Sequence, residues 1–176
     1  MSNEPKLRTV NKAKPPYELN KFPKSFIDTL GKELVYLMAT KDSYSLEGNE
    51  WEQIFANCIN ATWKPSNVGL DDIILGSCCW GAKTVISSSK NILNQKTVRL
   101  ISGRNSPAYS FEEDNILHQD PNYIGRLVLD IWNERVSAVR QIYKFVRTVV
   151  LVKGKTFDEF MVFETDTVRY LSLIHI

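Results

Sequence analysis

The stretch Leu70-Asp-Asp-Ile-Ile-Leu-Gly-Ser-Cys-Cys-Trp-Gly-Ala-Lys-Thr-Val-Ile86 decides the fold that this sequence predicts. Two short apolar runs, 70–75 and 78–86, lie on either side of Gly76 and Ser77. Short apolar runs separated by a glycine-containing pair are typical of two buried strands joined by a tight turn. We therefore expect a β-hairpin at the centre of the chain.

Helices are predicted before this hairpin. Apolar residues recur at helical spacing from Ser25 to about Thr40, which predicts a first helix. A second helix is expected after the break at 43–48, with Trp51 on its apolar face and its end near Trp63, shortly before a proline. Both are expected to pack on the rest of the domain.

After the hairpin, a third strand is expected at 97–102. The longest helix should run from Tyr123 to about Lys144, where apolar residues form a helical stripe. The segments 146–152 and 157–165 are rich in β-forming residues and predict a second hairpin. The resulting order is ααβββαββ, and the expected fold class is α+β.

Length and composition limit the classes of protein to consider. The chain has 176 residues, of which 43% are hydrophobic, and this suits a single domain with a core. A net charge of +2 argues against a disordered or uniformly basic protein. No apolar run approaches the roughly 18 residues of a membrane span, and the first residues do not resemble a signal peptide. We expect a cytoplasmic protein without a membrane partner.

The two ends of the chain differ from its middle. Residues 1–24 contain six basic and two acidic side chains and four prolines, which predicts a basic, irregular arm before a single domain at 25–170. The last six residues, Leu171–Ile176, back-translate to a sequence similar to the adapter of a transposon-based sequencing library. We therefore expect the reading frame to be truncated there and the natural protein to be longer.

The three cysteines are not expected to bind metal. Cys78 and Cys79 are adjacent, Cys58 is distant from them, and neither His118 nor His175 has a second ligand nearby in the sequence. Zinc sites need separated ligands with more cysteine or histidine behind them. Buried free thiols are the expected state.

Acidic and basic side chains meet at the hairpin. Asp71 and Asp72 lie at the start of its first strand, and Lys83 follows Asp71 by twelve positions, on the second strand. Adjacent antiparallel strands place such residues side by side. Carboxylates in this arrangement suit Mg²⁺, which keeps several waters and bridges to phosphate, and a lysine can stabilise phosphate charge or help to deprotonate an attacking water. The alternative is a solvated turn cap with a surface lysine.

At these residues the sequence resembles the PD-(D/E)xK nuclease superfamily, and more narrowly the type II restriction endonucleases. The resemblance covers roughly residues 50–152. It places the family's first acid on Asp71 or Asp72, its lysine on Lys83, and its upstream helical glutamate on Glu50 or Glu52. It implies a mixed central β-sheet flanked by helices, catalysis by these five residues, and Mg²⁺ bound by Asp71, Asp72 and Glu50. The implied activity is hydrolysis of phosphodiester bonds in double-stranded DNA by water attack.

One position departs from the family pattern, because Gly81 stands where a second acid is expected two residues before the lysine. A helical glutamate supplies the missing ligand, or Asp71 and Asp72 share the metal, or the protein is an inactive relative. The arrangement Gly69-x-Asp71 favours Asp71 over Asp72 as the principal ligand. The alternative function is a non-catalytic nucleic-acid-binding module or an inactive nuclease relative.

A long stretch without acidic residues suggests where nucleic acid binds. From Ile73 to Phe111 the chain contains no aspartate or glutamate but several basic and amide side chains, which suits a polyanion. The expected DNA-binding residues are Lys90, Lys96, Arg99, Arg104 and Asn105, the last two in a loop suited to reading bases in the major groove.

The partners that follow are double-stranded DNA, a second copy of the chain if cutting is palindromic, and a cognate methyltransferase if the protein is a restriction enzyme. A further alternative is an α+β interaction protein in which the acid-free stretch has no role.

Overall fold

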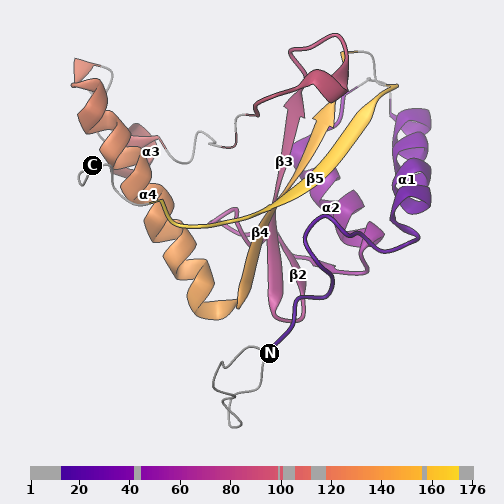
Figure 1. The fold of residues 1–176 in the computed structure, drawn as a ribbon, viewed down its shortest axis with the longest axis horizontal. Coiled ribbons are helices and arrows are strands. Elements are labelled where there is room, and N and C mark those ends of the chain that lie inside the picture. Colours follow the sequence, from indigo (N-terminus) through magenta and orange to yellow (C-terminus); the bar gives the residue numbers. More distant parts are fainter. Residues whose placement is uncertain are drawn as a thin grey trace, which may run out of the picture.

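The structure is a computed structural model and describes residues 13–41, 45–98, 100, 106–111, 118–155 and 158–170. Figure 1 shows a sheet with helices on both sides. In chain order the elements are α1 (Phe26–Thr40), α2 (Gly48–Cys58), β1 (Thr62–Trp63), β2 (Ile73–Leu75), β3 (Cys78–Ile86), the 3-10 helix η1 (Ile92–Asn94), α3 (Pro107–Phe111), α4 (Pro121–Ile142), β4 (Phe145–Lys153) and β5 (Phe160–Asp166).

The five strands form one mixed sheet in the order β1-β2-β3-β4-β5. The pairs β1/β2, β2/β3 and β4/β5 are antiparallel, whereas β3 and β4 are parallel along their whole length, from Cys78↔Phe145 to Ile86↔Lys153. Parallel neighbours need a crossover connection, and α4 provides it. The predicted α+β class is confirmed, as are the two hairpins and the long helix before β4.

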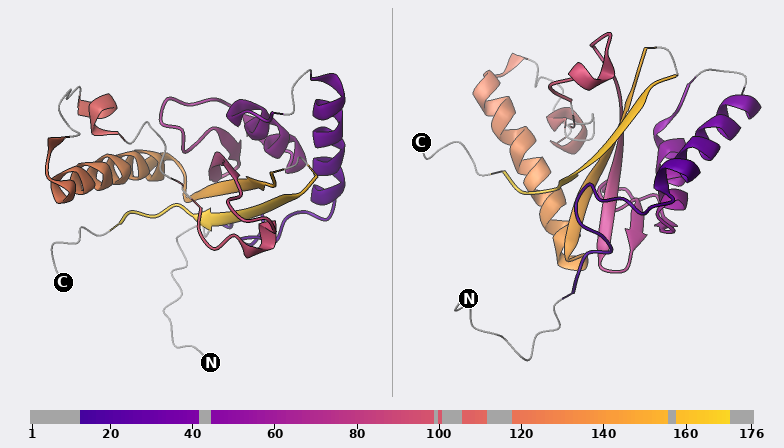
Figure 2. Two further views of the ribbon diagram at one scale, coloured as in Figure 1. Left: turned by 90° about the horizontal axis from the view of Figure 1, so that it is seen from above. Right: turned by 45° about the vertical axis from the view of Figure 1, so that its right-hand side comes forward.

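Helices cover the two faces of the sheet differently (Figures 1 and 2). On one face α2 packs on the sheet and α1 packs on α2, and the main core gathers there around the fully buried Trp51, Phe55 and Trp80. On the other face α4 buries Val136 and Val139 against β3 and β4. The three cysteines are buried free thiols, as expected.

The second helix ends earlier than the sequence predicted. It stops at Cys58, because Asn60 adopts a left-handed backbone conformation (φ 53°) that a helix cannot continue through. The chain then forms the short strand β1, which pairs with β2 in place of the predicted last helical turn.

The third strand was predicted in the wrong place. Thr97, Val98 and Leu100 are not part of any strand, while Arg99 and residues 101–102 lie outside the described residues. The apolar side chains of Val98 and Leu100 instead pack on a small cluster around Ile92, Val150 and Val152. Val98 and Leu100 are therefore partly buried against β4 without being part of a strand. The short helix α3 was not predicted.

Residues 13–24, the described half of the predicted arm, contain no helix or strand but are tied into the core. Their Tyr17 ring stacks near Trp80 with a centroid separation of 6.0 Å, and Asn20 exchanges hydrogen bonds with the backbone of Glu164 on β5. The irregular N-terminal segment is therefore part of the packed domain. No helix in the described residues is both long enough and apolar enough to cross a membrane.

A buried ion pair connects three strands to this segment. Glu164 on β5 lies 3.3 Å from Arg147 on β4, with side chains 0% and 4% exposed. The Glu164 carboxylate also accepts hydrogen bonds from Trp80 Nε1 (2.6 Å) and from the hydroxyl of Tyr17 (2.7 Å). Burial, together with the Glu164 charge, raises the pKa of Tyr17 far above its usual range, so this hydroxyl stays a donor.

Replacing Glu164 by glutamine should destabilise the fold strongly, because Arg147 would then be a buried charge without a carboxylate. Loss of one partner of a buried pair lowers the free energy of unfolding by about 3 kcal/mol or more. Urea denaturation followed by circular dichroism measures this. Glu159→Gln, at an exposed position just before β5, is the matched control and should change the value by less than about 0.5 kcal/mol. Equal stability of the two variants would contradict the role given to the pair.

Candidate functional site

A pocket of about 630 Å³ lies along the edge of β3 that β2 leaves uncovered. The strand β2 is short and pairs only with Cys78–Trp80, so the rest of β3, from Gly81 onward, runs past it. The N-terminal turn of α2, the 65–69 loop and α4 complete the walls. The lining includes Glu52, Ser66, Gly69, Asp72, Lys83 and Arg135. We call this cavity the Asp72 pocket.

Asp72 reaches this pocket from the residue that precedes β2. It is 6% exposed, and its Oδ1 accepts a hydrogen bond of 2.9 Å from the backbone N–H of Ser66. Its own carbonyl accepts another, of 2.7 Å, from the N–H of Lys64. These two bonds fix both the backbone and the carboxylate, so Asp72 is a rigidly placed acid in the pocket wall.

Asp71 does not line the Asp72 pocket. Its carboxylate accepts a hydrogen bond from the Ser66 hydroxyl, which itself accepts one of 3.0 Å from the Gly69 N–H. Burial and then the Asp71 charge raise the pKa of Cys79, which packs under α4. The sequence favoured Asp71 as the principal metal ligand, but Asp72 is the aspartate that lines the pocket. The two differ because adjacent residues at the start of a strand point to different sides.

The two helical glutamates also separate. Glu52 lines the Asp72 pocket and accepts a hydrogen bond of 3.0 Å from Trp63 Nε1 on β1. Glu50, two residues earlier, lies away from this pocket, because its carboxylate accepts from the N–H of Glu47 (2.7 Å) and pairs with the Lys41 ammonium (2.7 Å). Glu50 is therefore a helix-capping residue, and Glu52 is the glutamate that accompanies Asp72.

Lys83 projects from β3 into the same pocket, between Ala82 and Thr84 in the sequence. Gly81, two residues earlier, has the backbone of Gly69 and Leu70 directly against it. A Cβ atom at position 81 would lie 3.0 Å from both the Gly69 carbonyl oxygen and Leu70 Cα. Any side chain there requires the backbone to shift, so a second acid has no room at this position in the present structure.

Arg135 on α4 is a pocket residue that the sequence did not reveal. In the sequence, the charged residues of this helix have spacings such as that of Arg126 and Asp130, which are typical of a solvated helix face with pairs four residues apart. Instead its guanidinium reaches across to donate a hydrogen bond to the Val68 carbonyl, and its side chain lines the Asp72 pocket. Nothing in the helical periodicity marks this arginine, because its role depends on the loop opposite.

Two of the side chains that line the pocket are carboxylates, those of Asp72 and Glu52. Mg²⁺ is commonly held by one or two carboxylates with several waters and substrate phosphate, so these are the pocket residues that could supply its protein ligands. Within the described ranges, no group of three or more His, Cys, Asp or Glu is placed to hold a metal ion. Neither Asp71 nor Glu50 belongs to the pair.

Two of the predicted DNA-binding residues can be located. Lys90 and Lys96 are exposed and flank η1, in the segment that follows β3 at the end to which this strand points (Figure 1). Arg99, Arg104 and Asn105 lie outside the described residues. Of the five predicted DNA-binding residues, the structure therefore describes only Lys90 and Lys96.

No protein family, curated protein or solved structure matches this chain.

Glu50→Gln should lower the stability of the fold at neutral pH, and this loss should become smaller at acidic pH. Burial opposes ionisation of Glu50, but the Glu47 N–H and Lys41 outweigh it and hold its pKa below the usual 4.5. The charged form therefore stabilises the fold above about pH 4.5, and this is lost as the pH falls through the folded pKa. The variant should be less stable by up to about 1 kcal/mol at pH 7.

Urea denaturation at pH values from 7 down to 3.5 measures this difference, which should narrow below pH 4.5. Glu134→Gln, at an exposed position on α4, is the control and should differ little from the unmodified protein throughout. A Glu50→Gln difference that stays constant with pH would contradict the ionic role.

Proposed function

We propose that this protein is a Mg²⁺-dependent endodeoxyribonuclease of restriction-endonuclease type that hydrolyses phosphodiester bonds in double-stranded DNA. One observation carries the proposal. Asp72 before β2, Glu52 on α2 and Lys83 on β3 come from three separate elements and line one pocket. These are members of the acid, helical-glutamate and lysine sets that the resemblance to the PD-(D/E)xK superfamily singles out.

The order of the elements supports the same proposal. A helix, an antiparallel strand group, a crossover helix and a parallel strand follow one another as α2, β1–β3, α4 and β4. The resemblance implies a helix, a hairpin followed by a third strand, a helix and a further strand. The elements α2, β2–β3, α4 and β4 follow this order, whereas β1 precedes the hairpin and the described residues between β3 and α4 contain no strand. The pocket lies along the part of β3 that β2 does not pair with.

Each side chain has a task in this proposal. Asp72 and Glu52 would hold Mg²⁺, which supplies neutralisation of phosphate charge and a more acidic bound water. Lys83 places its ammonium against the scissile phosphate and stabilises the charge that develops on its oxygens. The hydrogen bond from Ser66 keeps Asp72 in place, and Lys90 and Lys96 neutralise phosphates farther along the DNA. A homodimer and a cognate methyltransferase remain part of this proposal.

Substitutions of the three pocket residues should abolish cleavage, whereas substitution of the nearby Glu50 should not affect it. Asp72→Asn, Glu52→Gln and Lys83→Ala should each lower the rate of plasmid cleavage in Mg²⁺ by on the order of a hundredfold or more, because each removes a charge next to the reacting phosphate. Glu50→Gln is the matched control and should cleave normally, since Glu50 caps α2 outside the pocket. Chelation of Mg²⁺ should stop the unmodified protein.

Gel electrophoresis of the plasmid measures these rates, and circular dichroism checks that each variant is folded. Undiminished cleavage by Lys83→Ala would overturn the assignment. Loss of cleavage in Glu50→Gln together with retention in Glu52→Gln would move the site to the other side of α2.

The alternative is a non-catalytic nucleic-acid-binding module or an inactive nuclease relative, and Gly81 is the observation that favours it. The backbone of 69–70 fills the space in which a second acid would stand. In this alternative the exposed lysines bind DNA and the pocket holds no reacting phosphate.

DNA binding through Lys90 and Lys96 is common to both functions and has its own test. The double variant Lys90→Ala/Lys96→Ala should bind a DNA duplex more weakly. Its slope of log affinity against log salt should decrease by about 2, because each lysine neutralises one phosphate. Fluorescence anisotropy at several salt concentrations measures this. The control Lys32→Ala, on α1, should leave the slope unchanged. An unchanged slope in the double variant would support the interaction protein that does not bind DNA.

A further inference from the structure

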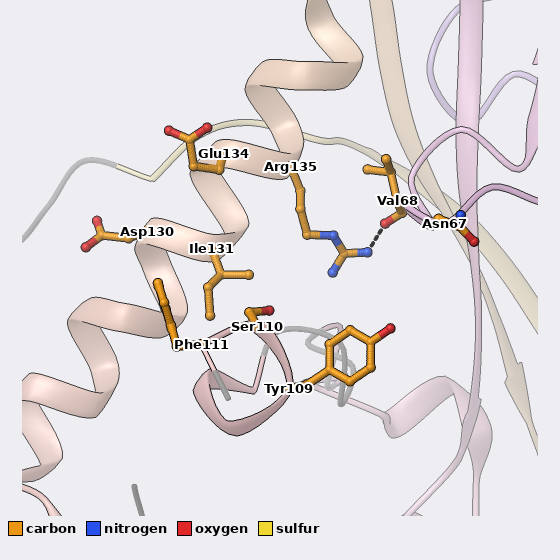
Figure 3. A pocket seen from close by; sticks show the side chains of 9 residues that line it. All are labelled: Asn67, Val68, Tyr109, Ser110, Phe111, Asp130, Ile131, Glu134 and Arg135. Carbon is orange, nitrogen blue, oxygen red and sulfur yellow. Dashed lines mark hydrogen bonds between the residues drawn. The ribbon is translucent and has the colours of Figure 1, made fainter. Parts of the chain in front are cut away.

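A second pocket adjoins the Asp72 pocket and has a different chemistry (Figure 3). Its volume is about 410 Å³, and it lies between α3, α4 and the 67–68 loop. Tyr109 and Phe111 project from α3, and Ile131 and Arg135 from α4. This cavity, which we call the Tyr109 pocket, has no role in the function proposed above.

The two pockets are neighbours because they share walls. Arg135 lines both of them. Within a single loop, Ser66 and Gly69 face the Asp72 pocket, while Asn67 and Val68 face the Tyr109 pocket. Figure 3 shows the Arg135 guanidinium spanning from α4 to the Val68 carbonyl, with the Tyr109 ring across the same space. The Arg135 side chain is therefore in a position to contact a ligand in either pocket.

The lining of the Tyr109 pocket favours a flat, uncharged group. The Tyr109 side chain is 71% exposed and Phe111 is 51% exposed, which leaves large aromatic surfaces open beside a cavity. The acids of this pocket, Asp130 and Glu134, oppose entry of a phosphate. Aromatic rings and a planar guanidinium are the groups on which nucleobases stack. A cavity of this size holds a single base with room to spare.

We propose that the Tyr109 pocket binds a nucleobase of the nucleic acid whose phosphate lies in the Asp72 pocket. The part of this inference that places a phosphate in the Asp72 pocket rests on the proposed function. The base leaves its stack, enters between Tyr109 and Arg135, and thereby sets the position of the neighbouring phosphate against Lys83. The pocket is thus a specificity site for the nucleotide next to the bond that is cut.

Three small probes separate the base from the phosphate. They are 2′-deoxyadenosine 5′-monophosphate, 2-deoxyribose 5-phosphate and 2′-deoxyadenosine, and their binding is measured by NMR titration with Mg²⁺ present. The unmodified protein should bind the nucleotide on the order of tenfold more tightly than the sugar phosphate, as stacking of one base predicts. Tyr109→Ala should remove this difference and leave the affinity for the sugar phosphate unchanged.

Two further variants control for indirect effects. Ser110→Trp, at an exposed position on α3, should fill the cavity and likewise remove the preference for the nucleotide. Tyr36→Ala removes an equally exposed tyrosine (69%) from α1 and should change nothing. A nucleotide preference that survives in both Tyr109→Ala and Ser110→Trp would overturn the base site.

Failure of this inference can be told from failure of the proposed function. Lys83→Ala should weaken the nucleotide and the sugar phosphate by the same factor and leave binding of the nucleoside unchanged. If the sugar phosphate binds through Lys83 but the base adds no affinity, the base site is wrong and the Asp72 pocket stands. If the nucleoside binds through Tyr109 but the phosphate adds nothing, the base site stands and the nuclease proposal is contradicted.

Discussion

The parallel pairing of β3 with β4 is the constraint on which the rest of the structure depends. Parallel neighbours cannot be joined by a tight turn, so the chain must leave the end of β3 and return along a crossover helix. That helix is α4, and its buried face fixes the position of Arg135 beside the 66–69 loop. Because β2 covers only the first three residues of β3, the rest of that edge stays open to the pocket.

A second constraint is electrostatic and lies on the face of the sheet opposite α4. The buried Glu164 carboxylate takes hydrogen bonds from Trp80 on β3 and Tyr17 in the N-terminal segment, and it pairs with Arg147 on β4. A buried charge of this kind is tolerated only when its partners are all in place. The network therefore specifies how the N-terminal residues and three strands fit together.

Apolar patterns predicted the long elements of the fold. The helices α1 and α4 follow from apolar residues at helical spacing, because each buries part of one face. The central and final hairpins follow from short apolar or β-rich runs on either side of a glycine, and the strands β3 and β4 are buried on both faces over much of their length. The strand β1 and the end of α2 were missed because a left-handed Asn60 ends the helix, and no apolar spacing encodes that turn. Likewise the sequence offered two candidate acids before the hairpin, Asp71 and Asp72, and two on the second helix, Glu50 and Glu52. Only the contacts in the structure show that Asp72 and Glu52 are the members of these pairs that line the pocket. Arg135 is 67 positions from Val68, whose carbonyl accepts its hydrogen bond.

Gly81 and Asp72 are linked by the same piece of backbone. The chain at 69–70 passes within 3.0 Å of where a side chain at position 81 would begin, and two residues later it delivers Asp72 to the pocket. Enlarging Gly81 would push this backbone and move Asp72 with it. In the proposed nuclease, the place of the second acid in the PD-(D/E)xK pattern is thus filled by the backbone that precedes Asp72, the proposed first acid. In a nuclease built on this arrangement, the second oxygen ligand has to come from α2, where Glu52 already faces the pocket.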